Sequence, residues 1–108
     1  METESEYVMG IISAPQDAAM AIARAVVEKK AAACAQITAP IHSIYFWEGC
    51  IHEDDEVLIL VKTRQEKTGI IQELLDELHP YDVPEFIMLP VLDGNRKYLS
   101  WIDTALRR

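Results

Sequence analysis

The chain has 108 residues, and its 18 acidic against 10 basic side chains give a formal net charge of −8 at pH 7. Half of the residues are hydrophobic, as in an ordinary globular domain, and no apolar run reaches membrane-spanning length. The negative charge repels phosphate backbones and anionic lipids, so we expect neither nucleic acid nor a membrane as a partner. The polar start METESE lacks the pattern of a secretory signal. We therefore expect one cytoplasmic domain over residues 7–108, after a flexible segment at 1–6.

The first part of the chain predicts a strand followed by an amphipathic helix. Residues 7–12 form an apolar run, and Ser13 with Gln16 matches a helix capping box. Apolar side chains at spacings of three and four then predict a helix that ends at a charged stretch, 28–30. The alanine-rich segment 31–35 suits a helix, whereas the residues that follow it suit a strand. Local propensity leaves the structure of this segment open.

The middle of the chain predicts a hairpin. Residues 41–47 are β-branched and aromatic, and 48–50 form a short glycine-containing turn. The second arm passes through the acidic run 52–56 into 57–61, five apolar residues without polar alternation. Such a run is typical of a strand that is buried on both faces. We therefore expect 57–61 to lie at the centre of a sheet.

The last part of the chain predicts a helix, a strand and a final helix. A second capping box at 63–66 precedes an apolar stripe that ends at Pro80. Residues 85–91 predict a strand, with Pro90 at an edge or a bulge because proline donates no ladder hydrogen bond. A third helix is predicted over 98–106. The order is β-α-β-β-α-β-α, an α+β ferredoxin-like βαββαβ sandwich with an additional C-terminal helix.

The predicted central strand also implies an assembly of several chains. Both main helices of such a domain lie on one face of the sheet, yet 57–61 presents large apolar side chains to both faces. An apolar sheet face that is open to water is a liability. We therefore expect further copies of the chain to cover it, and the edges of the hairpin to pair with a neighbouring chain.

Short stretches between Val8 and Leu106 match, in order and spacing, the pattern of one protein family. They are Ser13-Ala14-Pro15, Ala32-Ala33-Cys34, Ser43-Ile44-Tyr45-Phe46-Trp47-Glu48-Gly49, Glu56, Lys62-Thr63, His79-Pro80-Tyr81, Pro84-Glu85, Leu89-Pro90-Val91 and Tyr98-Leu99-Ser100-Trp101. With them the chain resembles the CutA family of divalent-ion tolerance proteins. The resemblance implies a homotrimer with long hairpin strands, and a bent strand that starts near Ala32 and bends near Pro40. It also implies binding of copper or other divalent cations and a contribution to the response to metal ions.

The segment HPYDVPE, residues 79–85, is predicted to be a loop because its two prolines exclude a helix. The resemblance makes His79, Tyr81 and Glu85 the family's most recognisable polar cluster. An imidazole suits copper and zinc, and a carboxylate completes or orients such a site. The alternative is structural: His79 interacts with the end of the preceding helix, and Glu85 satisfies backbone donors.

Cys34 is the third candidate metal ligand, since a soft thiolate suits Cu(I). A cysteine beside three alanines is more often a small buried packing residue. Ile12 and Leu78 stand where some members of the family carry a cysteine and a second histidine, and neither side chain binds a metal. Copper binding through His79 therefore needs help from Cys34, Glu85, a neighbouring chain or another surface, and we expect it to be weak or conditional.

The hairpin turn carries a second cysteine. We expect both cysteines to be free thiols, and Cys50 to be accessible and open to oxidation or to adventitious metal. His52 with the acidic residues 53–56 forms either a loosely selective cation patch or a solvated acidic edge. The second interpretation is favoured because alternate residues of a strand point to opposite faces.

An aromatic pocket between subunits is another candidate site. Its residues are Trp47, Lys62, Tyr81, Tyr98 and Trp101, of which the aromatic members also suit plain interface packing. In this alternative the protein is a trimeric regulatory or interaction scaffold, similar to the P-II signalling proteins, that binds a small metabolite or an unknown protein. Lys29, Lys30, Lys62 and Arg64 then bind an anionic ligand. No catalytic motif such as a phosphate loop or HExxH is present, so we predict no enzyme activity.

Overall fold

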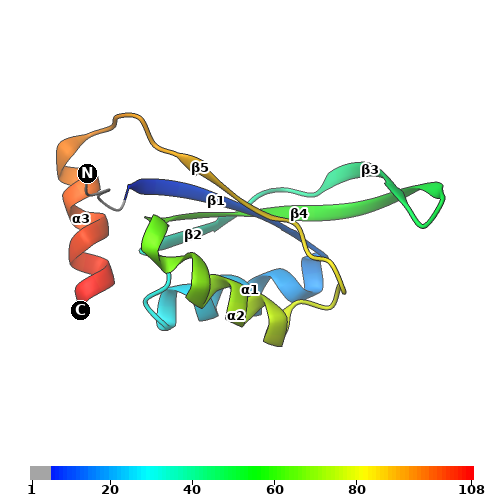
Figure 1. Cartoon of the computed structure of the whole chain (residues 1–108), viewed down its shortest axis with the longest axis horizontal. Coiled ribbons are helices and arrows are strands. Elements are labelled where there is room, and N and C mark those ends of the chain that lie inside the picture. The colour runs from blue at the N-terminus through cyan, green and yellow to red at the C-terminus, as the bar shows by residue number, and fades with distance from the viewer. Residues whose placement is uncertain (1–5) are drawn as a thin grey trace, which may run out of the picture.

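An antiparallel sheet, with two helices against one of its faces, makes up most of the structure (Figure 1). The computed structural model describes residues 6–108, so most of the segment expected to be flexible, residues 1–6, lies outside the described residues. The elements are β1 (Tyr7–Ala14), α1 (Gln16–Glu28), β2 (Cys34–Ile37), β3 (Ile41–Trp47), β4 (Cys50–Arg64), a 3-10 turn η1 (Gln65–Lys67), α2 (Thr68–Leu78), β5 (Phe86–Pro90) and α3 (Arg96–Arg107). No helix within the described part of the chain is long and apolar enough to cross a membrane.

The long strand β4 lies at the centre of the sheet. It pairs with β3 over its first half and with β2 and β1 over its second half, and β5 completes the order β2-β4-β1-β5. With β2 and β3 counted as one interrupted strand, this is the predicted split βαβ arrangement. The α+β class and the central place of 57–61 are confirmed. Pro90 lies on β5, where it pairs with Val8 of β1, and β5 is an edge strand as predicted.

Side chains along β4 alternate between the two faces of the sheet, and within a single chain the helices cover one of these faces. Val57, Ile59 and Val61 are buried in the core with α1 and α2, whereas Leu58 and Leu60 between them are only partly buried. The expectation that 57–61 is buried on both faces is therefore wrong for one chain. The reason is that both helices lie on the same side of the sheet (Figure 1).

The opposite face of the sheet carries a second set of apolar side chains. In the strand register Ile11 lies between Leu60 of β4 and Ile87 of β5. Ile87 and Leu89 are 48% and 42% exposed. Helix α3 packs through Ile102 at one end of the sheet (Figure 1), so within one chain much of this face is open.

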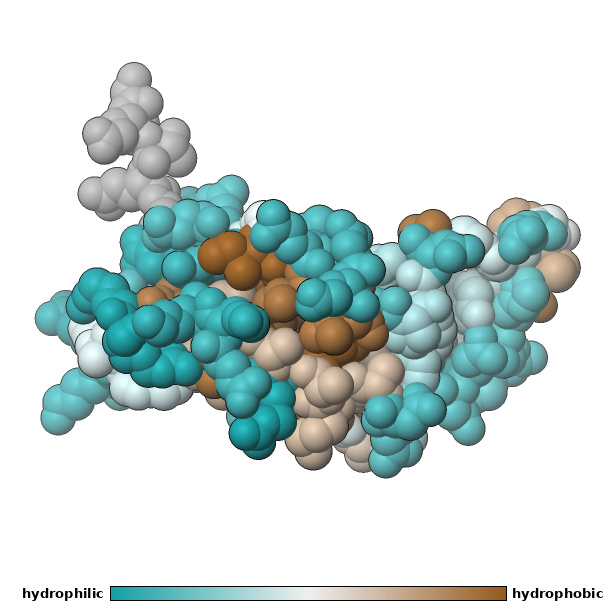
Figure 2. Space-filling model, turned by 90° about the horizontal axis from the view of Figure 1, so that it is seen from below, coloured by the Kyte–Doolittle hydropathy of each residue, from teal (hydrophilic) through white to brown (hydrophobic). Residues whose placement is uncertain are grey.

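The outer surface of the helices is different in character. Figure 2 views the molecule from the side of α1 and α2, where hydrophilic residues surround a hydrophobic area in the middle. Met20 of α1 and Ile70 of α2 are the exposed large apolar residues of the two helices. Most of the residues seen on this side are hydrophilic, whereas the open face of the sheet carries apolar side chains.

The β3–β4 hairpin extends beyond the helices (Figure 1). Its two-residue turn, Glu48 and Gly49, has positive φ angles of 49° and 82°, as type I′ hairpin turns require. Trp47 and Cys50 are paired on either side of the turn. The hairpin and the turn predicted from the sequence are confirmed.

The alanine-rich segment forms a tight connection that is neither helix nor strand over its first residues. The N–H groups of Ala31 and Ala32 both donate to the Val26 carbonyl at 2.9 Å, and the two side chains are fully buried. β2 begins at Cys34, and Pro40 lies in the break between β2 and β3. The long bent strand implied by the resemblance is thus present as two strands that share one partner, β4.

Both predicted capping boxes are wrong. Ser13 belongs to β1, and α1 begins after Pro15 without a side-chain cap. Thr63 is a buried residue of β4 whose hydroxyl donates to the Ala31 carbonyl at 2.7 Å. In both cases the strand extends past the residue expected to cap a helix. The reason is that Ser13 and Thr63 are still paired with residues of the neighbouring strand, β4 and β1 respectively. A side-chain cap is found at α3, where Asn95 accepts a hydrogen bond from the Tyr98 N–H at 3.1 Å.

Candidate functional site

The loop after α2 is fastened to β1 by His79. This side chain is 8% exposed, and its Nε2 lies 2.7 Å from the Ser13 carbonyl oxygen. Its Nδ1 accepts a hydrogen bond from the Tyr81 N–H at 3.2 Å. The Ser13 carbonyl oxygen can only accept a hydrogen bond, and the Tyr81 N–H can only donate one. The hydrogen of the ring therefore belongs on Nε2, and Nδ1 is the acceptor. Both ring nitrogens are therefore engaged with the backbone, and a metal ion could reach either only by breaking a hydrogen bond.

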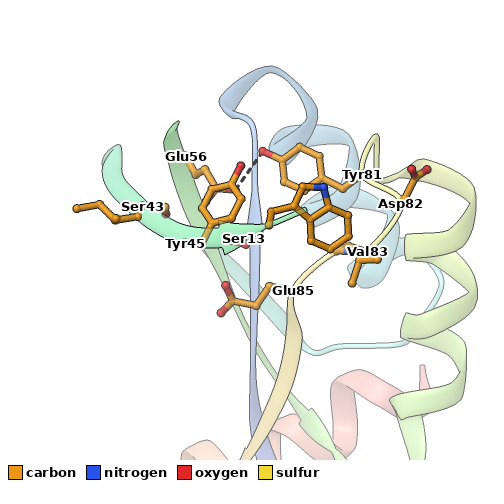
Figure 3. Close-up of a pocket in the computed structure, with 11 residues that line it drawn as sticks. Ser13, Ser43, Tyr45, Glu56, Tyr81, Asp82, Val83 and Glu85 are labelled. Carbon is orange, nitrogen blue, oxygen red and sulfur yellow. Dashed lines mark hydrogen bonds between the residues drawn. The ribbon is translucent and has the colours of Figure 1, made fainter. Parts of the chain in front are cut away.

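A second contact joins the same loop to the hairpin. The Tyr81 hydroxyl donates to Glu56 Oε2 at 3.1 Å (Figure 3). Glu56 belongs to β4 and is only 6% exposed. Burial first, and then the hydrogen bond and charge of Glu56, raise the pKa of Tyr81 to about 12. Tyr81 therefore stays a neutral hydrogen-bond donor at physiological pH.

Between the loop and the hairpin lies an open cleft of about 610 Å³. This volume falls in the range of sites that bind small organic molecules. β1 contributes Ser13, β3 and β4 contribute Ser43, Ile44, Tyr45, Trp47 and Glu56, and the loop contributes Tyr81, Asp82, Val83, Pro84 and Glu85 (Figure 3). The cleft is thus assembled from three segments that are distant in the sequence.

The charge of the cleft is of one sign. Glu56, Asp82 and Glu85 line it, and none of the lining residues is basic. Tyr45, also in the wall, donates its hydroxyl hydrogen to Asp54, and this hydrogen bond is the main reason why the pKa of Tyr45 is raised. The cleft therefore attracts cations and repels anions.

The metal ligands predicted from the sequence lie in different parts of the structure. Glu85 lines the cleft, whereas His79 is not among the lining residues and contacts the Ser13 carbonyl. Cys34 is paired with Lys62 in the strand register, and burial, followed by the proximity of Cys34, raises the pKa of Tyr98. Among residues 6–108, no three His, Cys, Asp or Glu side chains form a group that could hold a metal ion. The predicted set therefore needs a contribution from outside the single chain and stays a prediction.

The five residues predicted to form an inter-subunit pocket are also divided within one chain. Trp47 and Tyr81 line the cleft. The Lys62 ammonium donates to the side chain of Gln36. Tyr98 and Trp101 lie side by side on α3, with ring centroids 5.5 Å apart. Within a single chain, therefore, two of the five predicted residues line the cleft and the other three do not.

The structure brings together two donors that the sequence analysis considered only separately. Cys50 Sγ lies 3.3 Å from His52 Nε2 at the hairpin turn. The Trp47 carbonyl oxygen is 3.1 Å from the same nitrogen and 3.8 Å from the sulfur. Residues two apart on a strand point to the same face, and this spacing was the signal that could have identified the pair.

His42 is a further residue that the sequence analysis did not single out. Its two ring nitrogens lie 2.9 Å from Asp55 and 2.7 Å from Glu53. The hydrogen bond with Asp55, followed by that with Glu53, raises the pKa of His42. All three side chains are exposed, so this cluster is a solvated ion-pair group on the outside of the hairpin.

Comparison with known proteins relates the chain to one family. Residues 8–105 match the model of the family described as CutA1 divalent ion tolerance protein. The divalent-cation tolerance protein CutA of Thermus thermophilus is 43% identical over 97 residues, which are 90% of this chain and 94% of the relative. The chain spans 59 to 61% of the length of several longer animal and plant relatives.

Solved structures agree with this relationship. The crystal structure of CutA1 from Oryza sativa matches with a TM-score of 0.89 at 35% identity and covers 96% of each chain. The apo form of a PII-like protein CutA from Nostoc sp. PCC 7120 matches with a TM-score of 0.83 at 29% identity, over 92% of this chain and 96% of that chain.

Proposed function

The chain belongs to the CutA1 divalent ion tolerance family, and on this premise we propose that it binds copper or other divalent cations and contributes to the response to metal ions. The family description supports the cation class, and the net charge of −8 raises the local concentration of cations. The observation that carries the proposal is at the hairpin turn, where the Cys50 thiol, the His52 imidazole and the Trp47 carbonyl converge.

A metal ion bound by these atoms has reasonable geometry. With metal–sulfur and metal–nitrogen bonds of about 2.3 and 2.0 Å, the 3.3 Å between Cys50 Sγ and His52 Nε2 corresponds to roughly 100° at the ion. The Trp47 carbonyl oxygen supplies a third ligand and leaves a fourth position to solvent. A thiolate with an imidazole suits copper and zinc better than hard ions such as Mg²⁺.

His79, Glu85 and Cys34, the ligands predicted from the sequence, remain the alternative metal site. His79 uses both ring nitrogens in hydrogen bonds, and these residues do not form a cluster within residues 6–108 of one chain. His52 Nε2 is also in hydrogen-bond contact, but with the Trp47 carbonyl and the Cys50 thiol, which are the groups that would share the ion, and these donors converge without a second chain. We therefore place the hairpin set first.

A calorimetric titration of metal-free protein with Zn²⁺, repeated with Cu(I), separates the two sets of ligands. We expect Cys50→Ser and His52→Gln each to weaken binding by about tenfold or more, because even a group that only supports a ligand has an effect of that size. Affinity should rise with pH, since the thiol and the imidazole must release protons to bind.

Cys34→Ser is the matched thiol control and should bind as the wild type does, as should His79→Gln. Loss of binding in these two variants, with the hairpin variants unaffected, would move the site to the alternative set. No heat of binding for the wild type with either ion would contradict the metal proposal itself.

We also propose that the chain assembles as a homotrimer, as the resemblance implies. The support is the open face of the sheet, where Ile11, Leu60, Ile87 and Leu89 form an apolar surface without a covering helix in the same chain. Burial of such a surface drives association. The cytoplasmic location and the absence of enzyme activity stay predictions from the sequence.

The second candidate function is that of a trimeric regulatory scaffold that binds a small molecule. Two observations favour it: the cleft of about 610 Å³ between the loop and the hairpin, and the likeness to a solved protein described as PII-like. An anionic metabolite is not favoured in this cleft, because none of its lining residues is basic. The lysines predicted for that role lie outside the lining, including Lys62, which contacts Gln36.

A further inference from the structure

The cleft between the loop and the hairpin contains a buried acidic side chain, Glu56, that has no basic partner among the described residues. Glu56 is 6% exposed, and the Tyr81 hydroxyl donates a hydrogen bond to its carboxyl group. No Lys, Arg or His within the described residues 6–108 forms an ion pair with it. A buried charge is costly unless a charge of opposite sign compensates it. We propose that the cleft binds a small organic cation, an aliphatic diamine or polyamine, whose ammonium group pairs with Glu56.

The shape of the cleft favours an organic cation over a bare metal ion. Figure 3 shows the carboxylates of Glu56, Asp82 and Glu85 spread around the cleft instead of converging on one point. Consistent with this, the described residues contain no group of three ligating side chains that could hold a metal ion. A volume of about 610 Å³ is that of a small-molecule site. Separated carboxylates match a ligand whose positive charges are separated by a chain of carbon atoms.

The walls of the cleft complement the rest of such a ligand. Tyr45 and Trp47 come from β3 and Tyr81 comes from the loop, and all three rings remain partly exposed. Aromatic faces attract ammonium groups through their quadrupoles and pack against methylene chains. The hydroxyl groups of Ser13 and Ser43 add hydrogen-bond acceptors for further N–H groups.

This inference rests on the second candidate function and is independent of metal binding at the hairpin turn. The Cys50 and His52 side chains do not line the cleft. Loss of one activity is therefore separable from loss of the other. Amine binding should persist in the presence of a chelator and in the Cys50→Ser variant.

The test is a calorimetric titration of the full chain, in its native assembly, with 1,4-diaminobutane in a phosphate buffer that contains a chelator. We expect saturable binding that weakens as salt is added. Succinate, a dianion of the same chain length, should not bind. Glu56→Gln keeps the shape of the side chain and an acceptor for Tyr81, and should weaken binding by about tenfold or more because a buried charge pair is lost.

Glu53→Gln is the matched control, since Glu53 lies on the same strand but does not line the cleft. This variant should bind the amine as the wild type does. Trp47→Leu is a second cleft variant and should weaken binding of the amine, because an aromatic wall of the cleft is lost. Thermal unfolding of each variant confirms that it is folded.

Three outcomes would overturn the inference: no binding of the diamine, equal weakening by Glu56→Gln and Glu53→Gln, or binding of succinate with similar affinity. Failure of diamine binding with intact Zn²⁺ binding would leave the metal proposal in place. If the diamine fails but another small molecule binds in a manner that depends on Glu56, the scaffold function survives with a different ligand class.

Discussion

The hydrogen bond between Tyr81 and Glu56 contributes, after burial, to the raised pKa of Tyr81. The pKa of Tyr81, raised to about 12 by burial and by Glu56, lies above the value of about 10 for an unfolded chain. The folded protein therefore binds this proton more tightly than the unfolded chain does. The corresponding stability is fully present below about pH 10 and is lost as the pH rises from about 10 to 12.

Tyr81→Phe tests this contact. We expect the free energy of unfolding to fall by about 1 kcal/mol near neutral pH, because the buried Glu56 carboxylate loses its hydrogen-bond donor. Above about pH 10 the variant should lose stability less steeply than the wild type, since the titrating hydroxyl is absent. Tyr81 is 38% exposed, so solvent screening keeps this second effect small. Urea unfolding at several pH values measures both, and identical pH dependence in the two proteins would contradict the assignment.

At the scale of elements, the loop 79–85 depends on its attachment to β1. α2 ends where Pro80 prevents its continuation, but the direction of the loop afterwards is set by His79, which reaches Ser13 across 66 residues of sequence. This attachment places Tyr81 opposite the hairpin. One buried imidazole therefore shapes the wall of the cleft.

His79→Ala should release the loop from β1. We expect a loss of about 1 to 3 kcal/mol in the free energy of unfolding, as for a buried polar contact that is removed on one side only. Amide hydrogen exchange should accelerate in the loop 79–85 more than in α1, which serves as the internal reference. A variant with unchanged stability and exchange but lost metal binding would instead establish His79 as a ligand.

At the scale of the whole molecule, the sheet is covered by helices on one face and largely open on the other. Ile11, Leu60 and Ile87 form the middle of the open face. Within the described residues 6–108, helix α3 packs at one end of the sheet and leaves this middle part open. Other copies of the chain are the simplest cover for this surface.

For the homotrimer that we propose from the family resemblance, light scattering should give a mass three times that of the 12.2 kDa chain. Ile87→Glu places a charge on the open face and should shift the protein toward smaller species, because an unpaired charge is costly in an interface. Met20→Glu, at an exposed position of α1, is the control and should keep the wild-type mass. A monomeric wild type at micromolar concentration would refute the trimer.

Much of the fold is predictable from local pattern. Helical spacing identified all three helices, and the position of Pro90 at an edge followed from its missing N–H. The turn at Glu48-Gly49 followed from its composition. These features depend on neighbours in sequence, which are visible in the chain itself. The capping boxes failed because Ser13 and Thr63 are held in strands by partners far away in the sequence.

The order of the elements, the family resemblance and the residue types available for binding can all be read from the amino-acid sequence. What those residues do depends on the folded structure. It engaged both nitrogens of His79 with the backbone, brought Cys50 and His52 together at the turn, and buried Glu56 beside Tyr81 in a cleft built from three segments. The physical reason is that secondary structure follows from short-range periodicity, whereas burial, charge pairing and donor convergence depend on contacts between segments that only folding brings together.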